Sequence, residues 1–264
     1  ITCPADMTQV ADAGVCEAAV SVPAPAVADN CAVASVVNDY NNTADASGVY
    51  PVGTTSVIWT VTDLYGNTSS CTMNITVVDD QLPTITCPPN LTQTTDAGVC
   101  EALVSVPAPV TQDNCSVLSV VNDWTGTDNA SAIYPQGTTV VTWTVTDIHG
   151  NINTCTQQIT VNDQEAPAIT CPADITVNND LNSCDAFVNV PAPVVDDNCA
   201  VDFFVNDYNN SGDASGVYPV GTTTVTWTVT DVHGNTSTCS MNITVVDPEL
   251  PVITCPADIT QVAD

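Results

Sequence analysis

The sequence predicts an all-β protein built from tandem antiparallel β-sandwich domains, with about seven strands in each domain. Apolar and polar residues alternate with a period of two along many short segments, and no segment shows the period of an amphipathic helix. Gly, Pro, Asn and Asp separate these segments at short intervals, as expected for turns between strands.

An internal repeat organises the chain. The motif TDLYGN at 62–67 returns as TDIHGN at 146–151 and as TDVHGN at 230–235, a constant step of 84 residues. We therefore divide the chain into domains at 1–82, 83–166 and 167–250, with the start of a fourth repeat at 251–264. Residues 253–264 repeat residues 1–12 with one change, so we expect this chain to be an excerpt of a longer array.

Cysteine recurs at the same four positions of every repeat. Small domains are only marginally stable on their core alone, and four cysteines per domain predict two disulfides and an oxidising compartment. Zinc is a weaker interpretation, because the sequence has no CxxC pair and only two histidines. The cysteines are Cys3, Cys16, Cys31 and Cys71, then Cys87, Cys100, Cys115 and Cys155, then Cys171, Cys184, Cys199 and Cys239, with Cys255 opening the fourth repeat.

The charge balance is extreme. The chain has no Lys or Arg and 30 Asp and Glu, which gives a net charge of −30. This charge argues against nucleic acid and anionic membrane surfaces as partners, and it favours cations. The hydrophobic content of 44% argues against disorder, and this segment contains no apolar run long enough to span a membrane.

The elements of the first repeat illustrate the expected order. They are an edge strand within 1–10 interrupted by Pro4, a strand at 16–22, a strand at 33–37, a polar loop at 40–47, a tight turn at 50–54, a long strand at 55–63 and a last strand at 71–77. The long strand carries Trp59 on its apolar face, and Trp143 and Trp227 occupy the same place in the other repeats. This pattern is typical of an immunoglobulin-like sandwich in the broad sense.

The sequence does not favour an enzyme. His149 and His233 occupy one loop position where the first repeat has Tyr65, so we expect solvated loop side chains rather than a general base. The acidic residues recur in every repeat, whereas a catalytic pair of carboxylates belongs to one site. We therefore expect no catalytic residues.

Acidic residues are expected to converge where one repeat meets the next. Because strand direction alternates in a sandwich, the loop before the third strand and the loop before the last strand lie at the end of the domain that meets the preceding repeat. Ca²⁺ takes six to eight hard oxygen ligands, so we predict calcium at each junction. The candidate ligands are Asp79, Asp80, Asp113, Asn114 and Asp147 at the first junction, and Asp163, Glu165, Asp197, Asn198 and Asp231 at the second.

The same residues have a simpler interpretation. Asp and Asn in the TDxxGN and DN motifs are common turn formers that bond their own backbone, and the carboxylates would then be solvated without a metal. Nine Asn-x-Ser/Thr sequons, from Asn41 to Asn242, would mark glycosylation only if they are exposed and the source glycosylates asparagine.

Together the motifs resemble the hyalin repeat (HYR) domain. They are ITCP at the start, DNC in the middle, YPVGTT, TDxxGN and a final cysteine, and they cover all three repeats and the start of a fourth. The resemblance implies an immunoglobulin-like sandwich in extracellular tandem arrays with adhesive or structural roles, and it brings no catalytic residues. The four-cysteine form with DNC is similar to arrays in large secreted or surface proteins of bacteria.

The resemblance also implies a disulfide pairing. The simplest family members keep only the cysteines that match Cys3 and Cys71, so these two should pair, which leaves Cys16 to Cys31. The direction of the strands fits the second bond less well, because Cys16 begins its strand at the opposite end of the domain. A rival scheme pairs Cys31 with Cys71 and links Cys16 to Cys87 of the next repeat.

We therefore expect a non-enzymatic extracellular structural protein, a stalk or filament of disulfide-stapled domains arranged as a rod. Its partners would be neighbouring repeats and other copies in a filament. The alternative is an adhesin that binds a surface glycan with the variable loop at 40–48 of each repeat. Tyr40, Trp124 and Tyr208 occupy one position in that loop and are the candidate ligand contacts, although an aromatic ring there can simply cap the sandwich edge.

Overall fold

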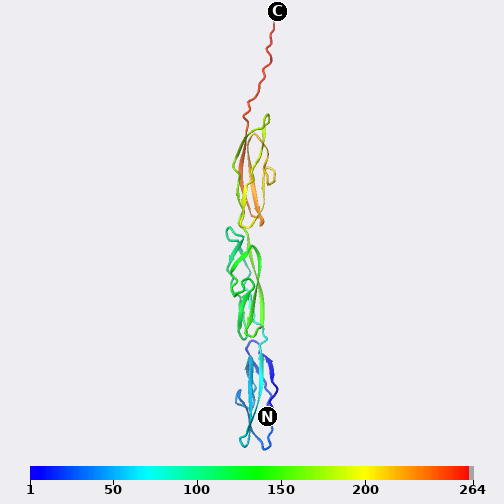
Figure 1. The fold of residues 1–264 in the computed structure, drawn as a ribbon, viewed down its shortest axis with the longest axis vertical. Helices are drawn as coiled ribbons and strands as arrows, with labels where there is room; N and C mark the ends of the chain where they lie inside the picture. The colour runs from blue at the N-terminus through cyan, green and yellow to red at the C-terminus, as the bar shows by residue number, and fades with distance from the viewer. Residues whose placement is uncertain (262–264) are drawn as a thin grey trace. The chain divides into compact units, whose positions relative to one another are not determined.

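The structure is a computed structural model that describes residues 1–261, so the last three residues of the expected fourth repeat lie outside the described range. All the regular secondary structure in this range is β-strand (Figure 1). No described segment forms a helix long and apolar enough to cross a membrane. The chain forms two compact units: residues 1–92, 103–134 and 138–160 make the first, and residues 93–102, 135–137 and 161 onward make the second.

The strands recur in the same order in all three repeats. The first repeat contains β1 (Met7–Val10), β2 (Glu17–Val20), β3 (Val33–Asn38), β4 (Gly48–Pro51), β5 (Gly53–Asp63) and β6 (Thr68–Val78). The second contains β7 (Thr84–Thr86), β8 (Leu91–Thr94), β9 (Glu101–Val104), β10 (Val110–Gln112), β11 (Val117–Asn122), β12 (Ala132–Pro135), β13 (Gly137–Asp147) and β14 (Ile152–Asn162). The third contains β15 (Ala168–Thr170), β16 (Ile175–Asn178), β17 (Asp185–Val188), β18 (Val194–Asp196), β19 (Val201–Asn206), β20 (Gly216–Pro219), β21 (Gly221–Asp231) and β22 (Thr236–Val246).

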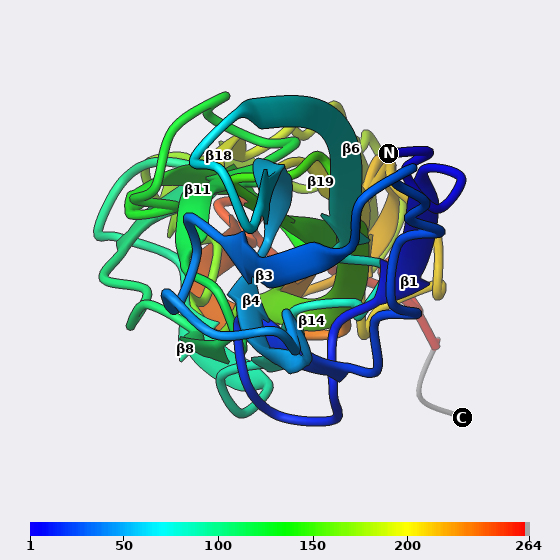
Figure 2. The ribbon, with the colours of Figure 1, turned by 90° about the horizontal axis from the view of Figure 1, so that it is seen from below.

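Each repeat combines a four-stranded sheet with a two-stranded sheet, and the second and third repeats each have a further two-stranded sheet, β7-β10 and β15-β18. In the first repeat the large sheet has the order β1-β6-β5-β3, and β2 pairs with β4 in the small sheet; Figure 2 labels β1, β3, β4 and β6. The third repeat has the equivalent order β16-β22-β21-β19, with β17 paired to β20. Apolar residues of both sheets form one core in each of these repeats. The expected all-β sandwich is confirmed.

The first and last strands of a repeat run in the same direction. β1 pairs in parallel with β6, with Met7 opposite Ile75, and β16 pairs in parallel with β22. The chain therefore enters a repeat at one end and leaves it at the other. The DNC loop and the TDxxGN loop lie at the entry end, whereas Cys16, at the start of β2, lies at the exit end.

The core of each repeat is centred on one tryptophan and one tyrosine. Trp59 and Tyr50 are fully buried, and so are their counterparts in the other repeats. The Tyr50 hydroxyl donates a hydrogen bond to the Ala46 carbonyl oxygen at 2.5 Å, so the buried phenol is satisfied. Burial raises the pKa of Tyr50 to about 12, with nearby Tyr40 and acidic residues adding to the effect.

Candidate functional site at the repeat junctions

Two equivalent junctions gather most of the predicted site residues. The first junction comprises residues 14–16, the linker 79–83, the DNC loop 113–115 and the loop 147–151. The second comprises residues 98–100, 163–167, 197–199 and 231–235. Each junction lies entirely within one compact unit.

The first set of disulfides closes individual repeats. Cys3 bonds Cys71, and the bonds Cys87–Cys155 and Cys171–Cys239 follow the same pattern, each across 68 residues of sequence. This is the pairing that the family resemblance implied. It joins the opening segment of each repeat to its last strand, next to the buried tryptophan.

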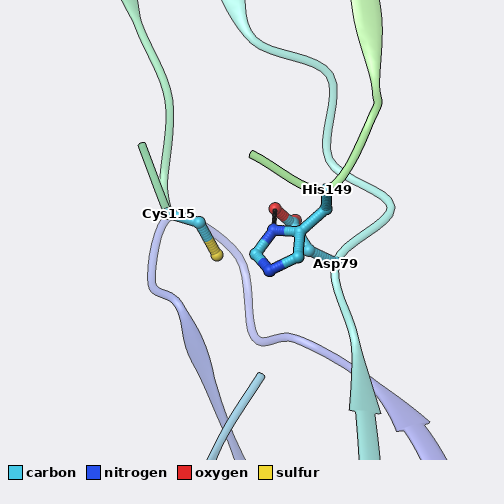
Figure 3. A group of neighbouring side chains, drawn as sticks. All are labelled: Asp79, Cys115 and His149. Carbon is cyan, nitrogen blue, oxygen red and sulfur yellow. Dashed lines mark hydrogen bonds and ion pairs between the residues drawn. The ribbon is translucent and has the colours of Figure 1, made fainter. Parts of the chain in front are cut away.

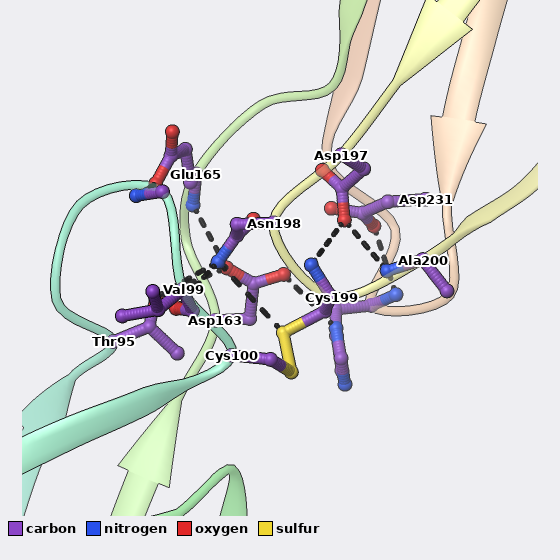
Figure 4. Close-up of a disulfide and its surroundings, with 12 residues drawn as sticks. Thr95, Val99, Cys100, Asp163, Glu165, Asp197, Asn198, Cys199, Ala200 and Asp231 are labelled. Atoms are coloured by element: carbon purple, nitrogen blue, oxygen red, sulfur yellow. Dashed lines mark hydrogen bonds and ion pairs between the residues drawn. A yellow bond between two sulfur atoms is a disulfide. The ribbon is translucent and has the colours of Figure 1, made fainter.

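The second set of disulfides joins successive repeats. Cys16 bonds Cys115 and Cys100 bonds Cys199, each across 99 residues and with Cα atoms 4.6 Å apart. Figure 4 shows the second of these bonds. The expected Cys16–Cys31 bond is therefore wrong, and so is the rival Cys16–Cys87 bond. Cys16 lies at the exit end of its repeat and Cys31 at the entry end, so Cys16 meets the DNC cysteine of the next repeat instead.

Three described cysteines have no bonded partner, and all three are exposed: Cys31, Cys184 and Cys255. Cys31 and Cys184 were expected to form disulfides within their repeats. Cys31 is the DNC cysteine of the first repeat, and Cys184 is the β2-type cysteine of the third. Each is thus the unpaired half of the bond that joins successive repeats elsewhere in the chain.

A buried carboxylate lies at the centre of the first junction. Asp79 ends the first repeat, and its side chain is fully covered. Its Oδ1 accepts hydrogen bonds from Asn114 Nδ2 at 3.1 Å and from the Gln81 amide at 3.2 Å. His149 Nδ1 lies 3.0 Å from its Oδ2 (Figure 3). The DNC loop and the TDxxGN loop of the second repeat therefore both contact the last residues of the first.

The second junction repeats this arrangement. Asp163 Oδ1 accepts hydrogen bonds from Asn198 Nδ2 at 3.2 Å and from Thr95 Oγ1 at 3.2 Å, and His233 Nδ1 lies 3.1 Å from its Oδ2. Burial raises the pKa of Asp163, but these hydrogen bonds and one from the Glu165 amide outweigh burial and leave the pKa below its usual value. The carboxylate is thus ionised at neutral pH.

The sequence suggested that the two histidines are solvated loop side chains. The structure shows instead that both make contacts across a junction. Their side chains are 28% and 24% exposed, and each contacts the buried carboxylate of the preceding repeat. The recurrence of histidine at one repeat position was the only signal in the sequence for this contact. The contacts of the histidines with Asp79 and Asp163 could not be predicted, because they depend on how two folded repeats meet. Sequence reasoning also missed Asn151, whose Nδ2 donates to the Asp79 carbonyl oxygen at 3.2 Å.

Asp147 satisfies its own turn as well as lying at the junction. Its Oδ1 accepts hydrogen bonds from the backbone amides of His149 and Asn151, and its Oδ2 accepts one from Asn151 Nδ2 at 2.7 Å. Burial raises the pKa of Asp147, but these hydrogen bonds lower it by more, so the net pKa is below its usual value. Asp231 accepts the equivalent hydrogen bonds from His233 and Asn235, and its pKa is also lowered. The aspartate of the TDxxGN motif therefore bonds its own turn, as the simpler turn-forming interpretation predicts.

The DNC loops leave buried oxygens without partners. Asp113 Oδ2 accepts hydrogen bonds from the Cys115 and Ser116 amides, whereas Asp113 Oδ1 and Asn114 Oδ1 are buried with no hydrogen-bond partner. Asp197 Oδ1 and Asn198 Oδ1 share this state at the second junction. Such oxygens are unfavourable in a protein interior unless a donor or a cation satisfies them.

Three carboxylates meet at each junction. Asp79, Asp113 and Asp147 each offer an oxygen within 4.8 Å of the others, and Asp163, Asp197 and Asp231 do the same. The remaining predicted ligands lie apart from these groups. Asp80 is exposed, and Glu165 Oε2 accepts a hydrogen bond from the Gly98 amide at 2.8 Å.

The candidate glycan contacts pack against the core. Tyr40 stacks on Tyr50 and Tyr208 stacks on Tyr218, with ring centroids 4.2 and 4.4 Å apart, and Trp124 lies over Tyr134 at 5.0 Å. The Tyr208 hydroxyl donates to the Val217 carbonyl oxygen at 2.8 Å, and Tyr40 bonds Val49 in the same way. This geometry is that of an aromatic cap on the sandwich edge.

Comparison with known proteins identifies the family. The family model described as the HYR domain matches residues 1–77, 78–161 and 162–245. The chain belongs to the HYR domain family. Hyalin of Strongylocentrotus purpuratus is 32% identical over the whole of this chain, and hyalin of Lytechinus variegatus is 30% identical over 95% of it. The chain spans 22% and 47% of the lengths of these two hyalins.

Among solved structures, the chain is similar to mouse cadherin-23 EC22-24, with a TM-score of 0.39 and 12% identity over 94% of this chain and 96% of that one. It is also similar to the protocadherin gammaB7 EC3-6 cis-dimer structure, with a TM-score of 0.35 and 15% identity over 91% of this chain and 72% of that one. The sequence relatives compared are animal proteins, so the bacterial affiliation expected for the DNC form gains no support from them.

Proposed function

We propose that this chain is part of a non-enzymatic extracellular structural array in which disulfides join each repeat covalently to the next. The observation that carries the proposal is the pair of bonds Cys16–Cys115 and Cys100–Cys199. They add a second covalent connection at a junction that the backbone already crosses, which suits a stalk or filament under tension. Domains at 1–82, 83–166 and 167–250 are the structural units of this array.

The same chemistry supports an extracellular location. Disulfides such as the five among the described residues typically form and persist in an oxidising compartment. A constant repeat step favours a rod of constant pitch, because each repeat mainly contacts its neighbours. A bacterial surface source stays our hypothesis, resting on the four-cysteine pattern alone.

Disulfide mapping of unreduced protein tests the proposal directly. The chain has no Lys or Arg for trypsin, so pepsin at low pH is the suitable protease, since thiol exchange is slow there. We expect one linked peptide pair that contains Cys16 and Cys115 and another that contains Cys100 and Cys199. A Cys16–Cys31 peptide in their place would overturn the proposal. Electron microscopy of native material would then test for a filament with a regular repeat.

We further propose that calcium binds at each junction. At the first, Asp79, Asp113, Asn114 and Asp147 would supply the ligands, and their counterparts would do so at the second. The three carboxylates repel each other at about 3.5–4 kcal/mol per pair for an effective dielectric constant of about 20, and a cation offsets this repulsion. The unpartnered oxygens of Asp113 and Asn114 are the hard ligands that Ca²⁺ prefers. The ion would supply charge neutralisation and no chemistry.

The rival to calcium is the hydrogen-bond network itself, in which Asn114, the Gln81 amide and His149 already surround the Asp79 carboxylate. Thermal unfolding with Ca²⁺ and with a chelator separates the two. We expect Ca²⁺ to raise the unfolding temperature, and Asp113→Asn to remove the part of that increase that comes from the first junction. Asp29→Asn is the matched control, because Asp29 forms the same turn in the first repeat without a preceding repeat. Equal unfolding temperatures with Ca²⁺ and chelator would refute calcium binding.

An adhesive function is the second candidate, with a surface glycan bound near the loop at 40–48 of each repeat. The observation that favours it is the partial exposure of Tyr40, Trp124 and Tyr208, which are 37%, 41% and 38% exposed. Binding on a glycan array that is lost in Tyr208→Ala, with the fold retained, would support it.

A further inference from the structure

We propose that the array acts as a tether of nearly constant length, in which the disulfides that close individual repeats carry tension past the folded sandwiches. Unfolding of a repeat under load then adds almost no length. The inference rests on the proposed function, because a fixed length is useful only in a stalk or filament under tension. It concerns the bonds that recur in each repeat, so it applies equally to a longer array.

The covalent route between Cys3 and Cys239 bypasses most of the chain. It crosses each repeat through the closing disulfide and follows the backbone only over 71–87 and 155–171, which we call the connecting segments. A connecting segment advances the chain by about 16 residues of the 84-residue repeat. The other 68 residues lie in a loop that the disulfide closes, and tension along this route does not reach them.

The closed loops make the stretched chain short. A fully extended chain spans about 3.5 Å per residue, so the backbone from Cys3 to Cys239 would reach about 830 Å without disulfides. The two connecting segments together reach only about 110 Å. Each disulfide adds a Cα–Cα distance of 5.7 or 5.8 Å. With its bonds intact, the same part of the chain therefore cannot exceed about 130 Å, even when all three repeats are unfolded.

The connecting segments are already extended in the folded protein. Residues 71–78 lie in β6 and residues 84–86 form β7, with a linker at 79–83 between the two strands. Strands β14 and β15 cover the second connecting segment in the same way, with a linker at 163–167. A strand rises about 3.3 Å per residue, which is close to the limit of a stretched chain. Full stretching of a connecting segment therefore gains at most about 20 Å, nearly all of it from the linker.

Hydrogen bonds to both repeats hold the linker after β6 in place. Gln81 Nε2 donates to the Asp12 carbonyl oxygen at 3.0 Å, and Gln81 Oε1 accepts a hydrogen bond from the Gly14 amide at 2.9 Å. On the side of the second repeat, Asn153 Nδ2 donates to the Pro83 carbonyl oxygen at 2.9 Å. The small slack of the linker is therefore released only after these contacts break.

The closing disulfide also keeps tension away from the pairing of the first and last strands. Cys3 lies ahead of β1, and Cys71 lies in β6 opposite Trp59 of β5. Tension that arrives at Cys3 passes directly to β6, whereas β1 to β5 lie within the loop that the bond closes. Without the bond, the same tension would shear the parallel pairing of β1 with β6. The bond therefore leaves most of the core outside the loaded segment.

The disulfides that join successive repeats determine what happens when a closing disulfide is lost. If the closing disulfide of the second repeat is absent, the load passes through Cys100–Cys199 instead. The route then follows the backbone over 71–100 and 171–199, which lengthens it by about 25 residues, or about 90 Å. If no joining disulfide existed, the whole loop of 68 residues would be released, which is about 240 Å.

Single-molecule pulling of the full chain tests the proposal, with a peptide tag at each end as the point of attachment. Free thiols are first blocked with iodoacetamide under non-reducing conditions, so that the disulfides do not exchange. The maximum extension is then measured before and after complete reduction. Two variants with equal numbers of changes are compared with the unaltered chain: Cys87→Ser with Cys155→Ser, and Cys100→Ser with Cys199→Ser.

In the unaltered chain we expect no extension step longer than about 40 Å, the slack of both connecting segments together, and a gain of about 700 Å on reduction. The variant without Cys87–Cys155 should extend about 90 Å further than the unaltered chain, whereas the variant without Cys100–Cys199 should match the unaltered chain. This comparison depends on covalent length alone, so it holds even if the second repeat unfolds without its bond. Longer steps in the oxidised unaltered chain, or an equal gain in both variants, would overturn the proposal.

The same samples separate this inference from the proposed function. A gain of about 240 Å for the variant without Cys87–Cys155 would mean that no joining disulfide takes up the load. That result would refute the covalent array but leave the fixed length of the unaltered chain intact. Long steps in the unaltered chain, with the Cys16–Cys115 and Cys100–Cys199 peptides present on mapping, would refute only the tether.

Discussion

Replacing Cys16 and Cys115 together by serine is expected to lower the free energy of unfolding by about 4 kcal/mol. The two cysteines lie 99 residues apart in sequence, but the Cys3–Cys71 bond provides a shorter covalent route between them. That route runs from Cys16 back to Cys3, across to Cys71 and along the backbone to Cys115, about 57 residues in all. Closing a loop of this size in the unfolded chain corresponds to the stated loss at about 25 °C.

Guanidinium unfolding followed by tryptophan fluorescence measures this loss, because Trp59 and Trp143 are fully buried in the folded repeats on either side of the bond. Cys31→Ser is the control, since Cys31 is exposed and unpaired. The double variant Cys3→Ser with Cys71→Ser opens the same ring and should have a similar effect. A loss below about 1 kcal/mol for the Cys16 and Cys115 variant, with its other disulfides intact, would refute the loop argument.

Three further predictions address the acids, the core and the loop. The pKa of Asp231 is lowered in the folded protein, so the carboxylate contributes its full stabilisation above the usual carboxyl pKa of 3.8. This stabilisation is lost as the pH falls through the pKa of the folded state. The free energy of unfolding measured in urea should therefore fall with pH across this acidic range, and Asp231→Asn should make that fall smaller. Trp143→Phe should lower the free energy of unfolding by about 1–2 kcal/mol more than Trp227→Phe. The reason is that Trp143 Nε1 donates a hydrogen bond to the buried Gln157 Oε1 at 3.3 Å, whereas Trp227 Nε1 has no hydrogen-bond partner. Equal losses in denaturant unfolding would contradict this. Tyr208→Ala should lower the free energy of unfolding by about 1 kcal/mol through loss of the ring stack on Tyr218, and an unchanged unfolding midpoint would show that the stack does not stabilise the loop.

The long strands could be predicted from the sequence because alternation extends over many residues. The strand expected at 55–63 is β5 at Gly53–Asp63, and the last strand expected at 71–77 is β6 at Thr68–Val78. β4 at Gly48–Pro51 was missed, since a strand of four residues that ends in proline resembles a turn. The three-residue strand β10 was missed for the same reason, because alternation has no meaning over so short a span, whereas β7 is the short edge strand expected at the opening of a repeat.

The junction could be predicted only in part. Alternating strand direction was enough to bring Asp79, Asp113 and Asp147 together, and the structure places them within 4.8 Å. The partner of Cys16 depends on how two folded repeats meet, which no pattern within one repeat encodes. The same argument about direction had already separated Cys16 from Cys31. The preferred scheme was wrong because it kept every bond inside its repeat, and the rival scheme did join successive repeats but through Cys87 instead of Cys115.

The two sets of disulfides together give the chain a redundant covalent path. One path crosses the first junction along the backbone between Cys71 and Cys87, and the other crosses it through Cys16–Cys115. A protease that cuts the linker between Cys71 and Cys87 therefore leaves both repeats attached, and the cut becomes visible only after reduction. Because the bonds overlap along the sequence, the same holds for any single cut between Cys3 and Cys239. Such a chain tolerates isolated damage and fails only when separate breaks coincide.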